Sequence, residues 1–198
     1  MSIFTKLAAS FSESRQELKK TSTLTCTALM LGASLLVSTF TIVLNPYMKI
    51  GFSTVPITIV GALFGPFVSG LAGGLGDILR FILRPTGAYF PGFTFDSIIN
   101  GIIFGLFLYK KKPTLKNVAL MQIVSTVLVS LVLHNLWVSL LYGKALMVIL
   151  PASILKNFLK LPIDVIVLYG LLKIVDQIKD RSFNVPPTGG GKALDAGK

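Results

Sequence analysis

Seven ionisable side chains lie in or beside long apolar runs of this sequence. They are Asp77, Arg80, Arg84, Asp96, Lys156, Lys160 and Asp164. A charge at the centre of a bilayer costs roughly 2.5–3.5 kcal/mol on insertion scales, so such residues are expected to face the protein interior. Spacings of three and four residues place the first three on one helix face and the last three on another. These charges form either salt bridges that tie helices together or a binding site for an anion.

The salt-bridge interpretation suits the two deeper aspartates, which have cations nearby in the sequence. It suits Arg80, Arg84 and Lys156 less well, because they approach one end of the apolar zone with only Asp96 as the nearest acid. Arginine is favoured for bidentate capture of carboxylate or phosphate. The surplus of positive charge therefore predicts an anionic ligand.

Aromatic and amide side chains accompany this charge in the stretches "RPTGAYFPGFTFD" and "HNLW". Flat rings held between aromatic side chains and bonded at their edges by Asn or Asp are typical of a heterocycle site. Two other interpretations stay open, namely an aromatic belt at the membrane interface and, for the histidine, a hydrogen-bonded core residue. The candidate ligand contacts added here are Tyr89, Phe90, Phe93, Asp96, Asn100, His134, Asn135 and Trp137.

The elements that position these residues are predicted to be membrane helices. The chain has 198 residues, of which 53% are hydrophobic and 14% are charged, with a mean hydropathy of +0.76. At about 20 residues per span, this length predicts an all-α membrane protein, a compact bundle of six transmembrane helices. The expected spans are residues 22–44, 55–64, 66–84, 94–109, 115–141 and 150–178.

The basic residues indicate how this bundle is oriented. They gather at the N-terminus, in the stretch "KKKPTLK" and near the C-terminus, and the alternate loops carry few of them. Positive loops mark the cytoplasmic side. We therefore expect both termini in the cytoplasm and the aromatic stretch after Arg84 outside, in a cell membrane.

Three parts of the chain are expected to differ in organisation. Residues 1–21 have apolar side chains at helical spacing, which predicts an amphipathic helix lying on the membrane face. Residues 22–180 form the membrane domain, and residues 181–198, rich in Gly and Pro, are expected to be a flexible tail.

Several kinds of function are not expected from this sequence. The stretch "GGLGD" lacks the lysine and hydroxyl of a phosphate-binding loop, and neither a nucleophile with its base nor a metal-ligand motif is present. The net charge of +11 gathers at helix ends and matches no nucleic-acid-binding module. We therefore expect neither an enzyme nor a nucleic-acid-binding protein, with no cofactor, no bound metal and a single cysteine, Cys26, in an apolar run.

Pairs of small residues four apart predict close approaches between helices. Most of them are explained by packing within the bundle. The pair Ala28 and Gly32 on the first span could instead dock another membrane subunit. The other pairs are Gly61 and Gly65, Gly70 and Gly74, and Gly101 and Gly105.

Three stretches together resemble a known family. They are "GLGDILRFILRPTGAYFPGFTFDSIINGIIFGLFLYKKKP", "HNLWVSLLYG" and "LKNFLKLPIDVIVLYGLL". Over roughly residues 22–178 the chain is similar to the folate-specific substrate-binding (S) components of energy-coupling factor (ECF) transporters. The resemblance implies a small six-helix membrane protein that binds folate from outside with high affinity.

The resemblance also implies partners and a mechanism. An S component works with a transmembrane coupling protein and two ATP-hydrolysing subunits, and it delivers its vitamin by toppling in the membrane. The family docks through an A-x-x-x-A motif on the first helix, at which this chain has Ala28 and Gly32. The loops "NPYMKIGFSTVP" and "RPTGAYFPGF" correspond to its gates.

Folate chemistry assigns expected roles to the candidate residues. The pterin edge would bond to Asp96, Asn100 or Asn135, and its rings would stack on Trp137, Tyr89 and Phe93. The glutamate carboxylates would pair with Arg84, Arg80 and Lys156. Rival interpretations are an S component for another vitamin such as riboflavin, a membrane scaffold subunit, and a stand-alone secondary transporter.

Overall fold

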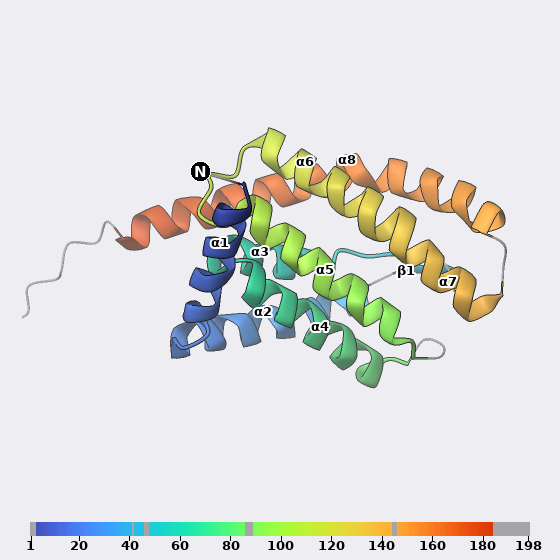
Figure 1. The fold of residues 1–198 in the computed structure, drawn as a ribbon, viewed down its shortest axis with the longest axis horizontal. Helices are drawn as coiled ribbons and strands as arrows, with labels where there is room; N and C mark the ends of the chain where they lie inside the picture. Colours follow the sequence, from blue (N-terminus) through green and yellow to red (C-terminus); the bar gives the residue numbers. More distant parts are fainter. Residues whose placement is uncertain (1–2, 41, 46–47, 86–88, 144–145, 184–198) are drawn as a thin grey trace, which may run out of the picture.

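The computed structural model describes residues 3–40, 42–45, 48–85, 89–143 and 146–183, and only the backbone for several short stretches of these, such as residues 3–9 and 178–183. Helices make up most of the described chain, and the longer ones run side by side along the long axis of the molecule (Figure 1). The helices before the first long loop are α1 (Ile3–Glu17) and α2 (Thr21–Thr39). After them come α3 (Thr54–Phe64), α4 (Pro66–Leu83) and α5 (Pro91–Leu108). The last helix of the described chain is α8 (Leu146–Phe183).

A rod of three consecutive helical segments lies between α5 and α8 in the sequence. It consists of α6 (Leu115–Ser125), η1 (Thr126–Leu133), which is a π-helix, and α7 (His134–Tyr142). A π-helix has more residues per turn than an α-helix, so the residues beyond it face a different side from the one that a continuous α-helix would give. Such segments occur frequently at functional sites.

The predicted helical runs coincide with observed helices, but the predicted end of the first span is wrong. Helix α2 ends at Thr39, and the residues expected to complete the span form strand β1 (Ile42–Asn45). This strand pairs antiparallel with β2 (Met48–Ile50), with Ile42 opposite Ile50. The stretch "TIVL" is rich in β-branched residues, which favour strands. Because it continues the apolar run of the helix, hydropathy alone does not distinguish the strand from the helix.

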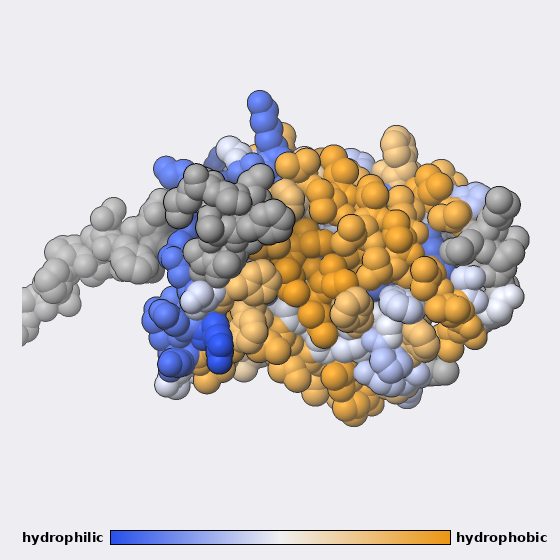
Figure 2. All heavy atoms as spheres, in the orientation of Figure 1, coloured by the Kyte–Doolittle hydropathy of each residue, from blue (hydrophilic) through white to orange (hydrophobic). Residues whose placement is uncertain are grey.

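Four of the described helices are long and apolar enough to cross a membrane, namely α2, α4, α5 and the rod formed by α6, η1 and α7. Helix α3 is apolar but shorter. Apolar side chains cover the middle of the molecule, and hydrophilic ones gather at one end (Figure 2). The described structure is therefore that of a helical membrane protein.

Helices α4 and α5 approach each other closely because glycines line their contact. A Cβ atom added to Gly101 would lie 2.2 Å from the carbonyl oxygen of Ser69, and one added to Gly73 would lie 2.3 Å from that of Ser97. These distances are shorter than any van der Waals contact. At Gly61, Gly70, Gly74, Gly101 and Gly105 the structure confirms the predicted close approaches.

A second close contact holds α1 against the turn between α3 and α4. The hydroxyl of Ser14, which is fully buried, donates to the carbonyl of Phe64 at 2.7 Å and accepts from the amides of Phe67 and Val68 at 3.1 and 3.2 Å. A helix N-terminus needs such an acceptor for its free amide groups. Ser14 therefore caps α4 from a different helix.

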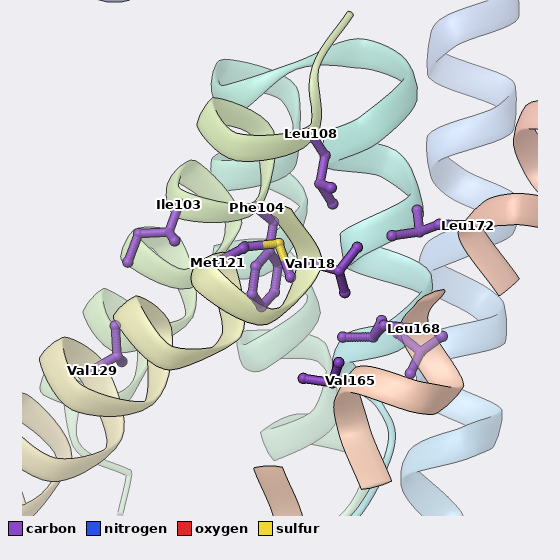
Figure 3. Close-up of a cluster of buried hydrophobic side chains, with 10 residues drawn as sticks. Ile103, Phe104, Leu108, Val118, Met121, Val129, Val165, Leu168 and Leu172 are labelled. Atoms are coloured by element: carbon purple, nitrogen blue, oxygen red, sulfur yellow. The ribbon is translucent and has the colours of Figure 1, made fainter. Parts of the chain in front are cut away.

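The largest apolar core lies where α5, α6 and α8 meet (Figure 3). Phe104 and Leu108 of α5 pack with Met121 of α6 and Leu172 of α8, and each of these side chains is at least 97% buried. Burial of this kind contributes about 25 cal/mol for each Å² of apolar surface when measured against water. Inside a membrane the shape of the packing contributes more than the burial itself.

Two charged pairs of the bundle lie inside single helices. Asp77 lies 3.9 Å from Arg80 in α4, and Asp164 lies 3.3 Å from Lys160 in α8. The predicted salt bridges are therefore present, but they do not join helices as expected. A neutral side chain joins α6 to α8 instead, because Gln122 of α6 donates a hydrogen bond to Asp164 of α8 at 3.1 Å.

Candidate functional site

Four rings from α5 and α7, with the residue that precedes α5, lie together at one end of the bundle. We call them the aromatic cluster: Phe90, Phe93, His134 and Trp137. The Phe90 ring lies 5.8 Å from that of Phe93 and 5.7 Å from that of Trp137, and Phe93 lies 5.2 Å from His134. Tilted or edge-on pairs at these distances are favourable. The structure thus brings together residues from two stretches that are about 40 positions apart in the sequence.

Asp96 lies beside this cluster, with its two carboxylate oxygens in different situations. The indole nitrogen of Trp137 donates to Oδ1 at 3.0 Å. The Nδ1 atom of His134 lies 3.5 Å from Oδ2, without a hydrogen bond. Oδ2 is buried and has no hydrogen-bond partner among the described residues. A buried carboxylate oxygen is costly unless a donor bonds to it, so Oδ2 of Asp96, with His134 beside it, offers an acceptor that makes no hydrogen bond to the described residues.

Pro91 and Gly92, at the start of α5, allow the rings of the aromatic cluster to meet. Helix α5 begins at Pro91, whose fixed φ angle suits the first turn of a helix. Next to it, a Cβ atom at Gly92 would lie 2.5 Å from the ring of Phe90 and 2.7 Å from that of Trp137. Only glycine therefore allows Phe90 and Trp137 to meet over this turn.

A chain of polar contacts leads away from the cluster. The Tyr89 hydroxyl lies 3.0 Å from Oγ1 of Thr94, which donates to Asp77 at 2.9 Å. Asp77 pairs with Arg80, whose Nη1 donates to the hydroxyl of Ser53 at 2.9 Å. The chain connects the residues before α3 with those before α5.

Arg80 is largely committed to this chain. Besides Ser53 and Asp77, its Nε donates to the carbonyl of Gly76 at 3.0 Å. Arg84 differs, because it lies beyond the end of α4, is exposed, and makes one hydrogen bond to the described residues, to the carbonyl of Thr39 at 3.2 Å. Arg84 thus leaves most of its five N–H donors unused toward the part of the chain that the structure describes.

The two candidate amides lie in contacts between helices. Asn100 accepts a hydrogen bond from Ser125. Asn135, 1% exposed, accepts from Ser153 of α8 at 2.8 Å and donates to the carbonyl of Leu131 at 3.0 Å. The structure therefore places both amides in hydrogen bonds outside the aromatic cluster. Lys156 belongs to α8, and its side chain lies outside the described residues.

Sequence reasoning missed three residues that shape the site. Ser53 and Thr94 hold the charged pair in α4, and Gly92 makes room for the rings. Serine and threonine near helix starts are too common to single out from a sequence. The glycine had a usable signal, since it follows a proline at the start of an apolar run.

The proposed docking pair lies on the outer side of α2. Ala28 and Gly32 are exposed, and no atom lies within 4 Å of a Cβ built on Gly32. The other predicted small-residue pairs contain glycines that contact a neighbouring helix, whereas Ala28 and Gly32 face away from the described bundle. The described chain itself offers nothing that packs on them.

Known proteins resemble this chain in sequence and structure. A family model described as "ECF transporter, substrate-specific component" matches residues 22–172. The folate transporter FolT of Clostridium novyi (strain NT) is 35% identical over 162 residues, which are 82% of this chain and 94% of that protein. FolT of Leuconostoc mesenteroides is 24% identical over 73% of this chain and 81% of its own length.

A solved structure agrees with these relatives. It is a crystal structure of FolT bound with folic acid, which matches with a TM-score of 0.74 at 31% identity and covers 79% of this chain and 97% of that one. The family model, the relatives and this structure agree on one kind of protein. The chain belongs to the substrate-specific components of ECF transporters, which are multi-pass membrane proteins that bind a transport substrate and are not enzymes.

Proposed function

We propose that this chain is the folate-specific S component of an ECF importer and that folate binds between the aromatic cluster and Asp96. The observation that carries this proposal is the Oδ2 atom of Asp96, which is buried beside four rings and has no hydrogen-bond partner among the described residues. The relatives described as folate transporters support the choice of vitamin.

The pterin part of folate fits this arrangement chemically. Its 2-amino group and ring N–H form an edge of donors, and a carboxylate accepts from such an edge with charge-assisted hydrogen bonds. Trp137 fixes Asp96 through Oδ1 and leaves Oδ2 for the ligand. Phe93, Tyr89 and Trp137 supply faces and edges against which flat rings stack.

The glutamate part of folate requires cations. Of the two candidates whose side chains are described, Arg84 has more unused donors, because Arg80 is bonded to Ser53 and Gly76. Arg84 therefore binds a carboxylate of the ligand, and Arg80 keeps the polar chain in place. Lys156 is retained as a second cation for the carboxylates.

The bundle crosses the membrane six times, with α3 and α8 as the two spans beyond the four long apolar ones. Helix α8 has 38 residues, which is ample for one crossing, and the polar face of its charged pair turns toward α6. The positive loops support a cytoplasmic location for both termini. Helix α1 lies at that side, and the aromatic cluster opens outward.

Transport requires partners. The exposed Ala28 and Gly32 on α2 form the face on which a transmembrane coupling protein docks, and two ATPase subunits supply energy. Folate is captured outside, and the subunit then topples onto the coupling protein to release it. The segments at residues 45–56 and 84–93, of which residues 46–47 and 86–88 lie outside the described structure, act as gates.

The test is to identify what the protein carries. The chain is purified in detergent and denatured, and the released small molecules are analysed by mass spectrometry. Folate at about one per chain is expected. Release of riboflavin or another vitamin would keep the family but contradict the ligand, and no binding on titration with any vitamin would contradict the function.

A further inference from the structure

A cavity lies at the other side of the bundle from the aromatic cluster, near α1 and the connection between α5 and α6. Its volume is about 310 Å³. Its walls include Ala62 and Leu63 of α3, Leu108 of α5 and Leu172 of α8, and Lys111 and Lys112 lie at its rim. We call it the basic cavity. It has an apolar floor and cations at its edge.

The lysines at this edge have donors to spare. Lys110 also lines the cavity, but its Nζ bonds to Glu13 of α1 at 2.8 Å, which raises the pKa of the ammonium group. Lys111 uses one N–H on the carbonyl of Leu106 at 3.1 Å. The Lys112 side chain has no hydrogen bond or ion pair to the residues that the structure describes. Among the described residues that line the cavity, one is acidic, Asp176, so Lys111 and Lys112 outnumber it.

The surroundings of the cavity suit a lipid. Hydrophilic side chains gather at this end of the molecule, and the apolar belt begins next to them (Figure 2). On α8, beside Leu172, the side chains of Leu171 and Ile174 are 38% and 52% exposed on the outside of the bundle. A ligand held here can thus place an anionic group on the lysines and an acyl chain along α8.

We propose that the basic cavity binds the headgroup of an anionic membrane phospholipid. Basic pockets between transmembrane helices on the cytoplasmic side recognise such headgroups, with each lysine contributing attraction. A free phosphate ion satisfies the lysines but leaves the apolar floor unfilled, so the lipid fits both parts. The site is independent of folate binding.

The experiment uses the full chain in detergent and native mass spectrometry. Phosphatidylglycerol and phosphatidylcholine with identical acyl chains are added separately. The protein is expected to retain one phosphatidylglycerol with roughly tenfold preference or more over phosphatidylcholine. Equal retention of both lipids would overturn the proposal, as would displacement of the lipid by millimolar inorganic phosphate.

Variants locate the site. The double variant Lys111→Gln/Lys112→Gln is expected to lose the preference for phosphatidylglycerol, and Ala62→Phe is expected to lose it without any change of charge. The control Arg15→Gln/Lys19→Gln removes two exposed charges at the same end and is expected to keep the preference. Thermal unfolding of each sample establishes that it is folded. Wild-type retention by the lysine double variant would overturn the proposal.

Discussion

The indole nitrogen of Trp137 lies 3.0 Å from Oδ1 of Asp96 and joins α7 to α5 beside the aromatic cluster. This bond orients a buried carboxylate whose second oxygen has no hydrogen-bond partner among the described residues. An oriented acceptor loses little entropy on binding, which favours affinity. The bond therefore connects the fold to the proposed recognition of the pterin.

The substitution Asp96→Asn tests the free carboxylate oxygen. An asparagine retains an oxygen that accepts from Trp137, but it presents a donor where the pterin also presents donors. Charge-assisted bonds contribute about 1.5–3 kcal/mol each, so folate affinity should fall by roughly 100-fold. Isothermal titration calorimetry measures this change. Glu13→Gln, an acid at the other end of the bundle, should leave affinity unchanged; a comparable loss there would contradict the assignment.

The substitution Trp137→Phe separates the ring from its hydrogen bond. A phenyl ring still stacks on the ligand, but Asp96 loses the donor that holds Oδ1. One hydrogen bond to a charged group is removed, so folate affinity should fall by roughly tenfold. Calorimetry again gives the result. Phe158→Leu, a change at a 78% exposed ring of α8, is the control, and wild-type affinity in the Trp137 variant would show that orientation is unimportant.

The role of Arg84 is tested with two ligands. Pteroate has the pterin and benzoate rings of folate but lacks its glutamate. Arg84→Ala should weaken folate binding by roughly five- to tenfold, as one charged hydrogen-bond partner is lost at an exposed position. Pteroate affinity should not change. If both ligands lost affinity equally, Arg84 would act on the structure of the site rather than on the glutamate.

The exposed small residues of α2 test the docking face. Gly32→Leu adds a side chain where no atom of this chain lies within 4 Å, so folate affinity should be preserved. Folate uptake by vesicles that also contain the coupling protein and ATPases should be lost. Gly170→Leu makes the same change at an exposed glycine of α8 with equally open space. Docking elsewhere is indicated if Gly32→Leu transports normally.

The cap that Ser14 makes on α4 predicts a stability effect without a binding effect. Ser14→Ala leaves the amides of Phe67 and Val68 without their acceptor, which costs about 1–2 kcal/mol. The midpoint of thermal unfolding in detergent should fall by several degrees, and folate affinity should stay the same. Ser12→Ala, at an exposed position of the same helix, should have no effect; an equal fall in both variants would rule out capping.

The helices were predictable from the sequence because a membrane span must be a long apolar run with its backbone bonds satisfied internally. The end of α2 was not, since "TIVL" is apolar in either a helix or the strand that begins at Ile42. The cap by Ser14 joins residues 50 positions apart. Such contacts depend on how helices pack, and no local pattern encodes them.

The candidate site was predictable in part, because some of its residues are unusual within apolar runs. Residue types and spacing placed Asp96 with His134 and Trp137, and the structure brings them together. The sequence did not reveal that Arg80 donates a hydrogen bond to Ser53, 27 positions away, or that Asn135 accepts one from Ser153 of α8. Which side of a helix meets which neighbour follows from tertiary packing, and here a π-helix changes that side just before His134.

Trp137 is the single tryptophan of the chain, so its fluorescence reports directly on the proposed site. Folate absorbs in the region where an indole emits, and a pterin stacked beside this ring should quench the signal. Titration of the emptied wild-type protein with folate should give saturable quenching at one ligand per chain, with riboflavin and thiamine giving none at equal concentration. Absence of saturable quenching by folate, or equal binding of the other vitamins, would contradict folate recognition at Asp96 and the aromatic cluster.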